Sequence, residues 1–263
     1  MDLPRALTIA GSDSGGGAGI QADLKTFSAL GVYGASAITA VTMQNTCSVL
    51  GVHELPPEAV VAQIDAVFSD IRIDSVKIGM LSSPEIVAAV ATALKHWNPR
   101  FIVLDPVMIS KSGCKLLREE SISNIRNGLI PIATVITPNI PEAEELTGLP
   151  IHSKTDMETA AGTLLDMGAK AVLLKAGHAT EHADDLLATP EKALWLPASR
   201  IQARNTHGTG CTLSSAIAAL LARGKSLGDS CREAKEYVRR AMSAGLEIGH
   251  GCGPLHHFVD WYR

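Results

Sequence analysis

Short apolar runs alternate along the chain with stretches in which apolar and polar positions follow a helical period. The first apolar run, residues 6–10, precedes a glycine-rich turn and then residues 19–30, where Ile20, Leu24 and Phe27 recur at helical spacing. Alternation of this kind, with strands that are apolar throughout, is typical of a parallel sheet covered on both faces. The pattern therefore predicts an α/β fold: a three-layer α/β/α sandwich with a mostly parallel central sheet.

The remaining elements follow from the same pattern. Further strands are expected at 35–43, 48–53, 75–78, 101–104, 133–137 and 171–174, with short antiparallel strands around Pro190 within 183–203. Helices are expected at 57–68, 84–97, 142–147, 157–167, 209–223 and 230–248. The strands near 33–53 interrupt the alternation, so they are expected to form a flap or an edge extension of the sheet. Because no repeat or linker divides the chain, we expect a single domain over residues 1–263.

Composition excludes several classes of protein. The chain has 263 residues, of which 46% are hydrophobic and 19% charged, which is too apolar for a disordered protein. No apolar run approaches the ~18 residues of a membrane span, so no membrane partner is expected. Lys plus Arg is 23 and Asp plus Glu is 27, a net charge of −4 without a basic tract, so no nucleic-acid partner is expected.

Cysteine usage is typical of a reducing compartment. The five cysteines are odd in number, widely spaced and without a C-x-x-C pair: Cys47, Cys114, Cys211, Cys231 and Cys252. This pattern indicates neither a disulfide framework nor a zinc knuckle. Residues 1–5 lack the basic region and apolar core of a signal peptide. We therefore expect a cytoplasmic protein.

Ligands of open α/β sheets gather at the carboxyl ends of the strands. Here those ends carry polar residues or glycines after apolar strands, at residues 11–13, 44–45, 79–80, 105–106, 138–139 and 175–177. Because packing alone does not demand polar residues there, the ligand site is expected at this edge of the sheet.

The first glycine-rich turn spans residues 11–19. A dinucleotide fingerprint would need an acidic residue at the end of the next strand, which instead ends in Met43-Gln44-Asn45. A Walker A loop would need Lys-Ser or Lys-Thr after Gly17, and neither is present. The turn is therefore expected to bring a ligand to backbone N–H groups in some other geometry, and the alternative is a tight flexible turn.

The second glycine-rich turn spans residues 205–212 and directly precedes a helix. The N–H groups of Gly208, Thr209, Gly210 and Cys211 are expected to lack helical partners and, with the helix dipole, to form an anion site. A thiol in that field is expected to have a lowered pKa. The alternative is that Cys211 is a small buried cysteine.

Three charged residues at strand ends and a helix start complete the candidate site. Lys175 follows a buried strand and is expected to clamp phosphate, although a surface lysine with a buried stem is the alternative. Asp105 and Glu142 are candidate ligands of Mg²⁺, which takes one or two carboxylates together with water and phosphate oxygens. Alternatively, Glu142 is a first-turn acid that stabilises its helix.

These motifs together resemble the hydroxymethylpyrimidine/phosphomethylpyrimidine kinases of thiamine synthesis, a branch of the ribokinase-like superfamily. The resemblance runs from about residue 6 to 245, and its marks are residues 7–13, 16–26, 42–46, 77–81, 105–108, 111–113, 137–142 and 205–214. Cys211 separates this branch from most sugar kinases of the superfamily, which carry an aspartate there. Ser14-Gly15 departs from the usual Pro-Ser, which bears on fine specificity.

The resemblance implies a ribokinase-like fold, Mg²⁺, and ATP as phosphoryl donor to 4-amino-5-hydroxymethyl-2-methylpyrimidine and then to its monophosphate. It places Gln44, Gly11, Asp23 and Met80 around the pyrimidine, Asp105 and Glu142 at the metal, Lys175, Asp105, Asn139 and Thr206 at ATP, and Gly208, Thr209, Gly210 and Cys211 at the catalytic anion hole. Gln44 suits an aminopyrimidine because its amide offers a donor and an acceptor in one plane.

Some alternatives remain open from sequence. Cys211 could take the proton of the alcohol acceptor or simply orient its hydroxyl; the second acceptor, a phosphate, needs no base. A pyridoxal or pyridoxine kinase of the same superfamily is the nearest rival function, and a non-catalytic pyrimidine-binding regulator is a more remote one. The strands near 33–53 could supply the edge of a homodimer.

Overall fold

A single nine-stranded sheet forms the centre of the protein in a computed structural model that describes residues 3–108, 119–177, 184–197, 201 and 205–261. The strands, in spatial order, are β3 (Val49–Glu54), β2 (Tyr33–Gln44), β1 (Arg5–Asp13), β4 (Ser75–Ile78), β5 (Ile102–Leu104), β6 (Val135–Ile136), β7 (Val172–Leu174), β8 (Asp185–Thr189) and β9 (Lys192–Leu196). Strands β2, β1 and β4 to β7 pair in parallel, whereas β3, β8 and β9 join antiparallel at the two edges. The mostly parallel sheet is thus confirmed.

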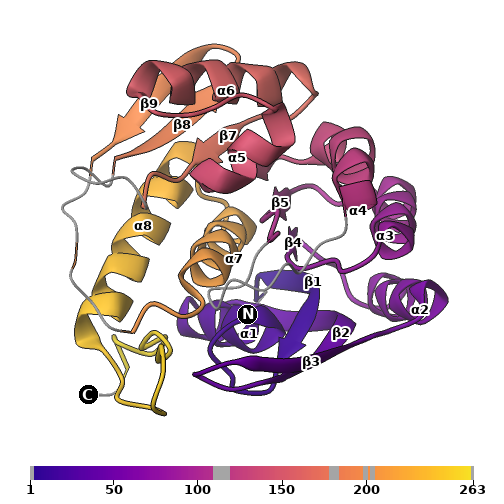
Figure 1. Cartoon of the computed structure of the whole chain (residues 1–263). Coiled ribbons are helices and arrows are strands. Elements are labelled where there is room, and N and C mark those ends of the chain that lie inside the picture. Colours follow the sequence, from indigo (N-terminus) through magenta and orange to yellow (C-terminus); the bar gives the residue numbers. More distant parts are fainter. Residues whose placement is uncertain (1–2, 109–118, 178–183, 198–200, 202–204, 262–263) are drawn as a thin grey trace.

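Helices cover both faces of the sheet (Figure 1). One face carries α1 (Gly19–Ala29), α7 (Thr209–Ala222) and α8 (Leu227–Ala244), whose apolar residues share a core with Val103 and Val135. The opposite face carries α2 (Pro57–Phe68), α3 (Pro84–Trp97), α5 (Ile140–Thr147) and α6 (Lys154–Asp166). The three-layer arrangement predicted from the sequence is therefore confirmed.

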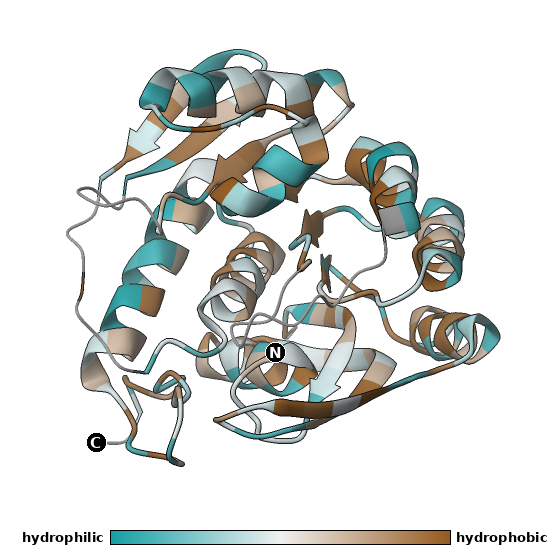
Figure 2. Cartoon of the chain, in the orientation of Figure 1, coloured by the Kyte–Doolittle hydropathy of each residue, from teal (hydrophilic) through white to brown (hydrophobic). Residues whose placement is uncertain are grey.

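The central strands are apolar because both of their faces are covered. Every residue of β4, β5 and β7 is buried, and Figure 2 shows hydrophobic colour in the middle of the sheet and hydrophilic colour on the outer faces of the helices. Burying one such aliphatic side chain contributes roughly 1.5–3 kcal/mol. No helix among the described residues is long and apolar enough to cross a membrane.

Element bounds agree with the sequence pattern where local signals are strong. Helix α3 begins at Pro84 after Ser83, whose side chain accepts a hydrogen bond from Ile86 N–H, and it ends at Asn98 in the left-handed conformation. The pattern missed a short helix, α4 (Glu119–Asn124), and the π and 3₁₀ turns that continue it to Ile132. Strand β2 is a full member of the sheet, and β3 extends its edge. Of the two expectations for residues 33–53, the edge extension is therefore confirmed and the flap is not.

Candidate active site

The parallel topology brings the expected site residues to one edge of the sheet. Gln44 ends β2, Met80 lies just after β4, Asp105 directly follows β5, Asn139 caps the helix after β6, and Lys175 directly follows β7. Carboxyl ends of parallel strands share an edge, so residues distant in sequence become neighbours there.

The second glycine-rich turn forms the start of α7. Gly208 caps this helix with φ +80°, and among the described residues no acceptor lies within hydrogen-bond reach of the N–H groups of Gly208, Gly210 and Cys211. Thr209 differs from the expectation, because its N–H faces the Thr206 carbonyl at 3.4 Å. Three of the four expected amides are therefore available to an anion, and they lie at the positive end of a helix.

Lys175 and Asp105 lie next to this second turn, which is an open turn in the sense that three of its amides lack an acceptor in the part of the chain that the structure describes. Lys175 Nζ is 3.1 Å from Asp105 Oδ1, and a Cβ added at Gly210 would lie 3.5 Å from both Lys175 Nζ and Asp105 Oδ2. Thr137 and Ser214 also donate hydrogen bonds to Asp105. Burial alone would lower the pKa of Lys175, but Asp105 and Glu142 raise it above its ordinary value. Lys175 is therefore a fixed positive charge beside the turn.

Glu142 stabilises the start of its own helix, which was the alternative expected from the sequence, and its pKa is shifted as well. It forms a capping box with Asn139: Glu142 Oε2 accepts from Asn139 N–H at 2.8 Å, and Asn139 Oδ1 accepts from Glu142 N–H at 2.9 Å. Burial raises the pKa of Glu142 to about 7; Lys175 opposes this rise, and the nearby charge of Asp105 adds to it. Asp105 and Glu142 thus lie within electrostatic reach of each other.

Two buried carboxylates beside a turn with unpaired backbone amides fit a hard divalent cation. A positive ion there would stabilise the ionised form of Glu142, which burial disfavours, and Mg²⁺ takes few protein ligands when phosphate oxygens and water supply the rest. No cluster of three or more His, Cys, Asp or Glu residues that could hold a metal occurs in the part of the chain that the structure describes. The donors therefore suit a metal that enters with a phosphate ligand.

The expectation of a lowered pKa for Cys211 is wrong. Burial raises the pKa of the Cys211 thiol to about 11; Lys77 and a hydrogen bond from Gly19 N–H lower it, and the charges of Asp23 and Asp105 raise it further. Desolvation thus outweighs the positive field of the helix start. At neutral pH the thiol is protonated.

Asp23 does not line an accessible pocket, contrary to the expectation. Its side chain is 0% exposed, and it forms an ion pair at 2.9 Å with Lys77, which is also 0% exposed. Thr8 and Ser215 donate further hydrogen bonds to it, at 2.6 Å each. Asp23 is therefore a buried carboxylate with its own hydrogen-bond and ion-pair partners, close enough to Cys211 to influence its pKa.

The first glycine-rich turn closes on itself. The Asp13 carboxylate accepts from the N–H groups of Gly15 at 2.8 Å, Gly17 at 3.0 Å and Ala18 at 2.8 Å. Burial alone would raise the pKa of Asp13, but hydrogen bonds from His207 and from these amides hold it below its usual value. The expected contact of a ligand with these amides is therefore not available, because an acidic side chain of the turn already occupies them.

Gln44 lies where the two turns meet. Ser14 Oγ donates to Gln44 O at 2.8 Å and accepts from Gln44 N–H at 2.9 Å, so the unusual Ser14 anchors the end of β2. The Gln44 side-chain amide lies 3.1 Å from His207 Nε2, and through that contact Gln44 borders the open turn. His207 was not among the expected site residues, although it lies inside the second motif; its position one residue before Gly208 was the available signal.

Gly11 and Met80 lie next to each other, and their place around the pyrimidine stays a prediction. A Cβ at Gly11 would lie 2.4 Å from the Met80 methyl group, and a Cβ at Gly19 would lie 2.4 Å from the Gly11 carbonyl oxygen. Glycine at both positions thus lets β1, β4 and α1 approach closely at the side of Cys211.

Thr206 contacts the C-terminal tail. Its hydroxyl lies 3.3 Å from Cys252 Sγ, and its carbonyl accepts from the Thr209 hydroxyl at 2.7 Å. These contacts shape the open turn, and a role of Thr206 toward ATP stays a prediction. Residues 111–113 of the expected motif and Cys114 lie outside the described residues.

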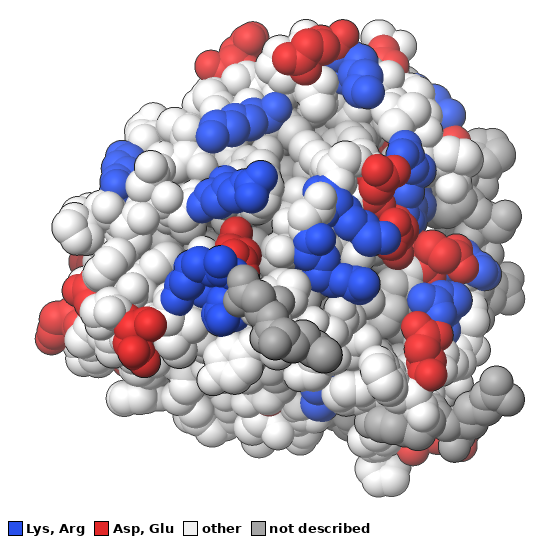
Figure 3. All heavy atoms as spheres, turned by 180° about the vertical axis from the view of Figure 1, so that it is seen from behind, with Lys and Arg blue, Asp and Glu red and all other residues white. Residues whose placement is uncertain are grey.

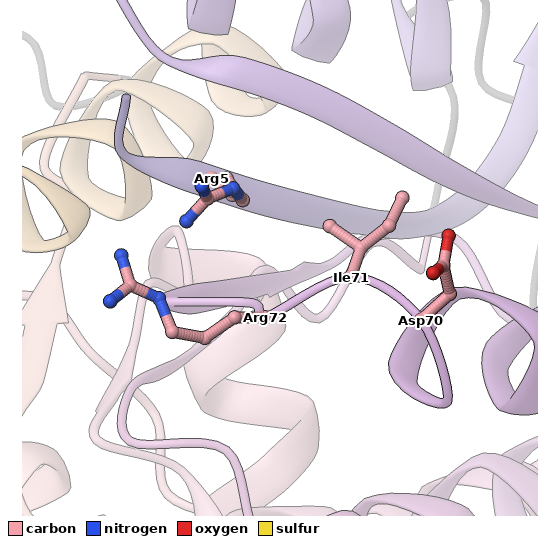
Figure 4. Close-up of a pocket in the computed structure, with 4 residues that line it drawn as sticks. All are labelled: Arg5, Asp70, Ile71 and Arg72. Atoms are coloured by element: carbon pink, nitrogen blue, oxygen red, sulfur yellow. The ribbon is translucent and has the colours of Figure 1, made fainter. Parts of the chain in front are cut away.

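A hollow lies away from these residues, at the amino-terminal edge of the sheet. Its lining residues are Arg5, Asp70, Ile71 and Arg72 (Figure 4). Arg72 pairs with Asp74 at 3.5 Å, and Asp74 also accepts from Arg5 N–H. On the face shown in Figure 3, Lys and Arg side chains are accompanied by Asp and Glu. The hollow shares no residue with the site.

Sequence comparisons match the whole chain to one group of enzymes. A family model described as phosphomethylpyrimidine kinase matches residues 13–256. The hydroxymethylpyrimidine/phosphomethylpyrimidine kinase of Salmonella typhimurium is 51% identical, with 100% of each chain covered. The protein of the same name from Rhizobium meliloti is 52% identical, with 98% of each chain covered.

Solved structures of kinases are also similar to this chain in fold. The phosphomethylpyrimidine kinase of Clostridium difficile has a TM-score of 0.82 at 48% identity, covering 90% of this chain and 98% of that one. The pyridoxal kinase of Staphylococcus aureus in complex with ADP has a TM-score of 0.92 at 36% identity, covering 99% of this chain and 96% of that one.

Proposed function

The chain belongs to the phosphomethylpyrimidine kinase family, and from this we propose how its own residues perform two successive phosphoryl transfers. It is a kinase of thiamine biosynthesis. The first acceptor is the hydroxymethyl group of 4-amino-5-hydroxymethyl-2-methylpyrimidine, and the second is the resulting monophosphate. ATP is the donor.

The observation that carries this proposal is the open turn beside a fixed lysine. Phosphoryl transfer needs positioning and charge stabilisation more than covalent chemistry. The free N–H groups of Gly208, Gly210 and Cys211 would receive the equatorial oxygens of the transferred group, and Lys175 would neutralise the phosphate chain. The proximity of Gly210 to both Lys175 and Asp105 supports this assignment.

Asp105 and Glu142 would hold Mg²⁺ at the phosphates. The metal, when bound, supplies positive charge that offsets the charge of ATP. Asp105 also keeps Lys175 protonated and oriented through the 3.1 Å contact. Asn139 fixes the Glu142 carboxylate through the capping box, which makes Asn139 a positioning residue for this site.

Cys211 orients the acceptor hydroxyl rather than removing its proton. A thiol with a pKa of about 11 is almost entirely protonated at pH 7, so it is a poor general base. A site without a strong base suits both steps, because the second acceptor is already an anionic phosphate. Cys211 lies at the open turn, where it can contact the acceptor oxygen.

Gln44, Gly11 and Met80 would bind the pyrimidine ring. Removing the amide by Gln44→Leu leaves polar atoms of the ring unpaired, which costs about 1–3 kcal/mol. We expect the KM for the pyrimidine to rise about tenfold or more while the KM for ATP changes little. An unchanged pyrimidine KM would remove Gln44 from the ring site.

The function is tested by ADP release with the pyrimidine alcohol and then with its monophosphate. We expect turnover with both acceptors. The pyridoxal kinases among the solved neighbours make pyridoxal and pyridoxine the comparison substrates, and a higher kcat/KM for either would favour the rival function. Binding of the pyrimidine without ADP release from any acceptor would instead indicate a non-catalytic regulator.

We further propose that two copies of this chain associate through the β2–β3 edge. Val41, Met43, Leu50 and Val52 are exposed there, with Leu50 exposed by 76%, and β3 is the last strand of the sheet. An unprotected apolar edge strand favours pairing with another chain. Sedimentation should show a dimer that Leu50→Lys dissociates, whereas Ile248→Lys, at another exposed apolar residue, should leave it intact. A monomeric wild-type protein would contradict the proposal.

A further inference from the structure

Four polar side chains form a connected hydrogen-bonding group around Gln44, where the pyrimidine ring is proposed to bind. His207 Nε2 lies 2.9 Å from Asp13 Oδ2 and 3.1 Å from one terminal atom of the Gln44 amide. The other terminal atom of that amide lies 3.4 Å from Thr42 Oγ1. The two ends of a glutamine amide have nearly the same shape, so their partners decide which is oxygen and which is nitrogen.

The contact with Asp13 decides the proton on His207. The Asp13 carboxylate is ionised, because its pKa lies below the usual value, and an ionised carboxylate only accepts hydrogen bonds. His207 must therefore carry a hydrogen on Nε2 to satisfy the 2.9 Å contact. The single Nε2 hydrogen is then shared between Asp13 Oδ2 and the Gln44 atom at 3.1 Å. Because an Nε2–H cannot accept from an amide NH₂ group, that Gln44 atom has to be the oxygen Oε1.

Thr42 leads independently to the same arrangement. Its hydroxyl has one hydrogen, and the nearest acceptor is the Ser12 carbonyl at 2.8 Å. With that hydrogen used, Thr42 Oγ1 faces Gln44 with lone pairs, and the atom opposite it has to be the donor Nε2. Two neighbours on opposite sides of the amide thus require one orientation.

We propose that Asp13 and His207 lock the Gln44 amide with Oε1 toward His207 and Nε2 toward Thr42, and that this lock makes the site select a 4-aminopyrimidine over its 4-oxo counterpart. The inference rests on the proposed function, in which Gln44 pairs with the ring. His207 and Asp13 are positioning residues, since they act through Gln44.

The selectivity follows from complementary donors and acceptors. A 4-aminopyrimidine presents an N–H donor at position 4 and an acceptor at ring nitrogen 3, which match Oε1 and Nε2 respectively. A 4-oxo ring presents an acceptor at position 4 and an N–H at nitrogen 3, so it needs the amide turned by 180°. A free glutamine turns at little cost, whereas a locked one leaves both pairs mismatched, and sites built around such pairs discriminate strongly.

The test compares the 4-amino substrate with its 4-oxo counterpart, by kcat/KM for ADP release and by calorimetric binding without ATP. We expect the wild-type protein to prefer the amino ring by about a hundredfold or more, because two hydrogen-bonding pairs are lost with the oxo ring. His207→Leu should reduce this preference about tenfold or more. His207→Gln, which keeps an N–H donor near the place of Nε2, should retain most of it, with stability of both variants followed by thermal melting.

The outcomes separate the lock from the proposed function. An unchanged preference in a folded His207→Leu protein, or equal wild-type binding of both rings, would overturn the lock. A wild-type protein that releases no ADP would count against the proposed function, while calorimetry would still test the lock. Should the variants fail to fold, ¹⁵N spectra of wild-type His207 decide: a hydrogen on Nε2 supports the proposal, and an Nδ1–H form with a bare Nε2 contradicts it.

Discussion

The two glycine-rich turns look alike in sequence, yet only one of them can bind an anion. In the first, Asp13 accepts from the N–H groups of Gly15, Gly17 and Ala18, so the turn supplies its own anion. In the second, the N–H groups of Gly208 and Gly210 have no acceptor among the described residues. The turns pack against each other, since a Cβ at Gly208 would lie 1.8 Å from the Gly17 carbonyl oxygen.

The contrast between the two turns shows that glycine content alone does not define an anion site. Glycine permits the backbone to present its amides, but a site exists only where those amides remain unpaired. A short acidic side chain at the start of a turn is enough to occupy them. The closed first turn packs against the open second turn and against Gln44, and it helps to fix the position of both.

The largest effect is expected for Gly208→Ala. The added Cβ meets the Gly17 carbonyl, and the left-handed backbone disfavours any side chain, which together cost about 3–5 kcal/mol. We expect a large fall in thermal stability and loss of activity. Gly31→Ala is the matched control, since Gly31 has φ +72° with nothing within 4 Å, and it should cost only about 1–2 kcal/mol. Equal losses in the two variants would refute the contact between the turns.

Gly210→Ala should separate activity from stability. Its Cβ would meet Asp105 and Lys175 at ordinary contact distance, so the helix start still folds, and alanine favours a helix over glycine. The methyl group occupies the space proposed for the phosphoryl group, so kcat/KM should fall by about 10²–10³ in both steps. Wild-type activity in this variant would place the phosphoryl group elsewhere.

Asp13→Asn should open the closed turn. Three backbone amides and His207 lose an ionised acceptor, and we expect a loss of about 2 kcal/mol at pH 7. Because the pKa of Asp13 is depressed when folded, its stabilisation is present above the unfolded pKa of 3.8 and lost as the pH falls through the lower folded pKa. Denaturant titrations should thus show a difference from wild type at pH 6–8 that shrinks below about pH 4. A constant difference would exclude the carboxylate charge as its cause.

The Glu142→Gln substitution, beside the open turn, should raise the stability of the protein and lower its catalytic activity. The folded pKa of about 7 lies above the unfolded 4.5, so the wild type loses stability as the pH rises from about 4.5 through 7. Glutamine can still accept from Asn139 N–H, so the variant should be more stable by about 1–2 kcal/mol at pH 8 and unchanged at pH 4. Its kcat should fall and its need for Mg²⁺ rise. A destabilised variant at pH 8 would contradict the raised pKa.

The smallest effect is expected in the pH dependence of the wild-type first step. With a thiol pKa of about 11, a general-base role for Cys211 would make the rate rise nearly tenfold per pH unit between pH 7 and 9. In the proposed mechanism Cys211 only orients the hydroxyl, so we expect a change of less than about threefold over that range.

The order of strands and helices was readable from sequence because each central strand is buried on both faces and each helix keeps its period. Helices α2 (Pro57–Phe68) and α3 have the bounds expected from the sequence, and each begins at a proline. The π and 3₁₀ turns after α4 were not readable, since Pro131 and its apolar neighbours obey neither period. The place of the site followed from the topology of parallel strands alone.

The chemistry at the site was only partly readable. The proximity of Lys175 and Asp105 was foreseen, because both follow parallel strands of the predicted sheet, whereas Gly210 was placed with them only by the family resemblance. The burial of Asp23 with Lys77 was missed, since partners 54 positions apart leave no local trace. The high pKa of Cys211 was missed as well, because sequence indicates the helix dipole but not the desolvation that outweighs it.

In the proposed mechanism, the amides at Gly208, Gly210 and Cys211 receive the phosphoryl group in transit. A crystal structure with ADP, Mg²⁺, aluminium fluoride and the pyrimidine alcohol tests it most directly. We predict fluoride atoms within about 3 Å of the Gly210 and Cys211 nitrogens, with Lys175 on the phosphate side. A fluoride group bound at the first turn, or out of hydrogen-bond reach of the second, would contradict the account.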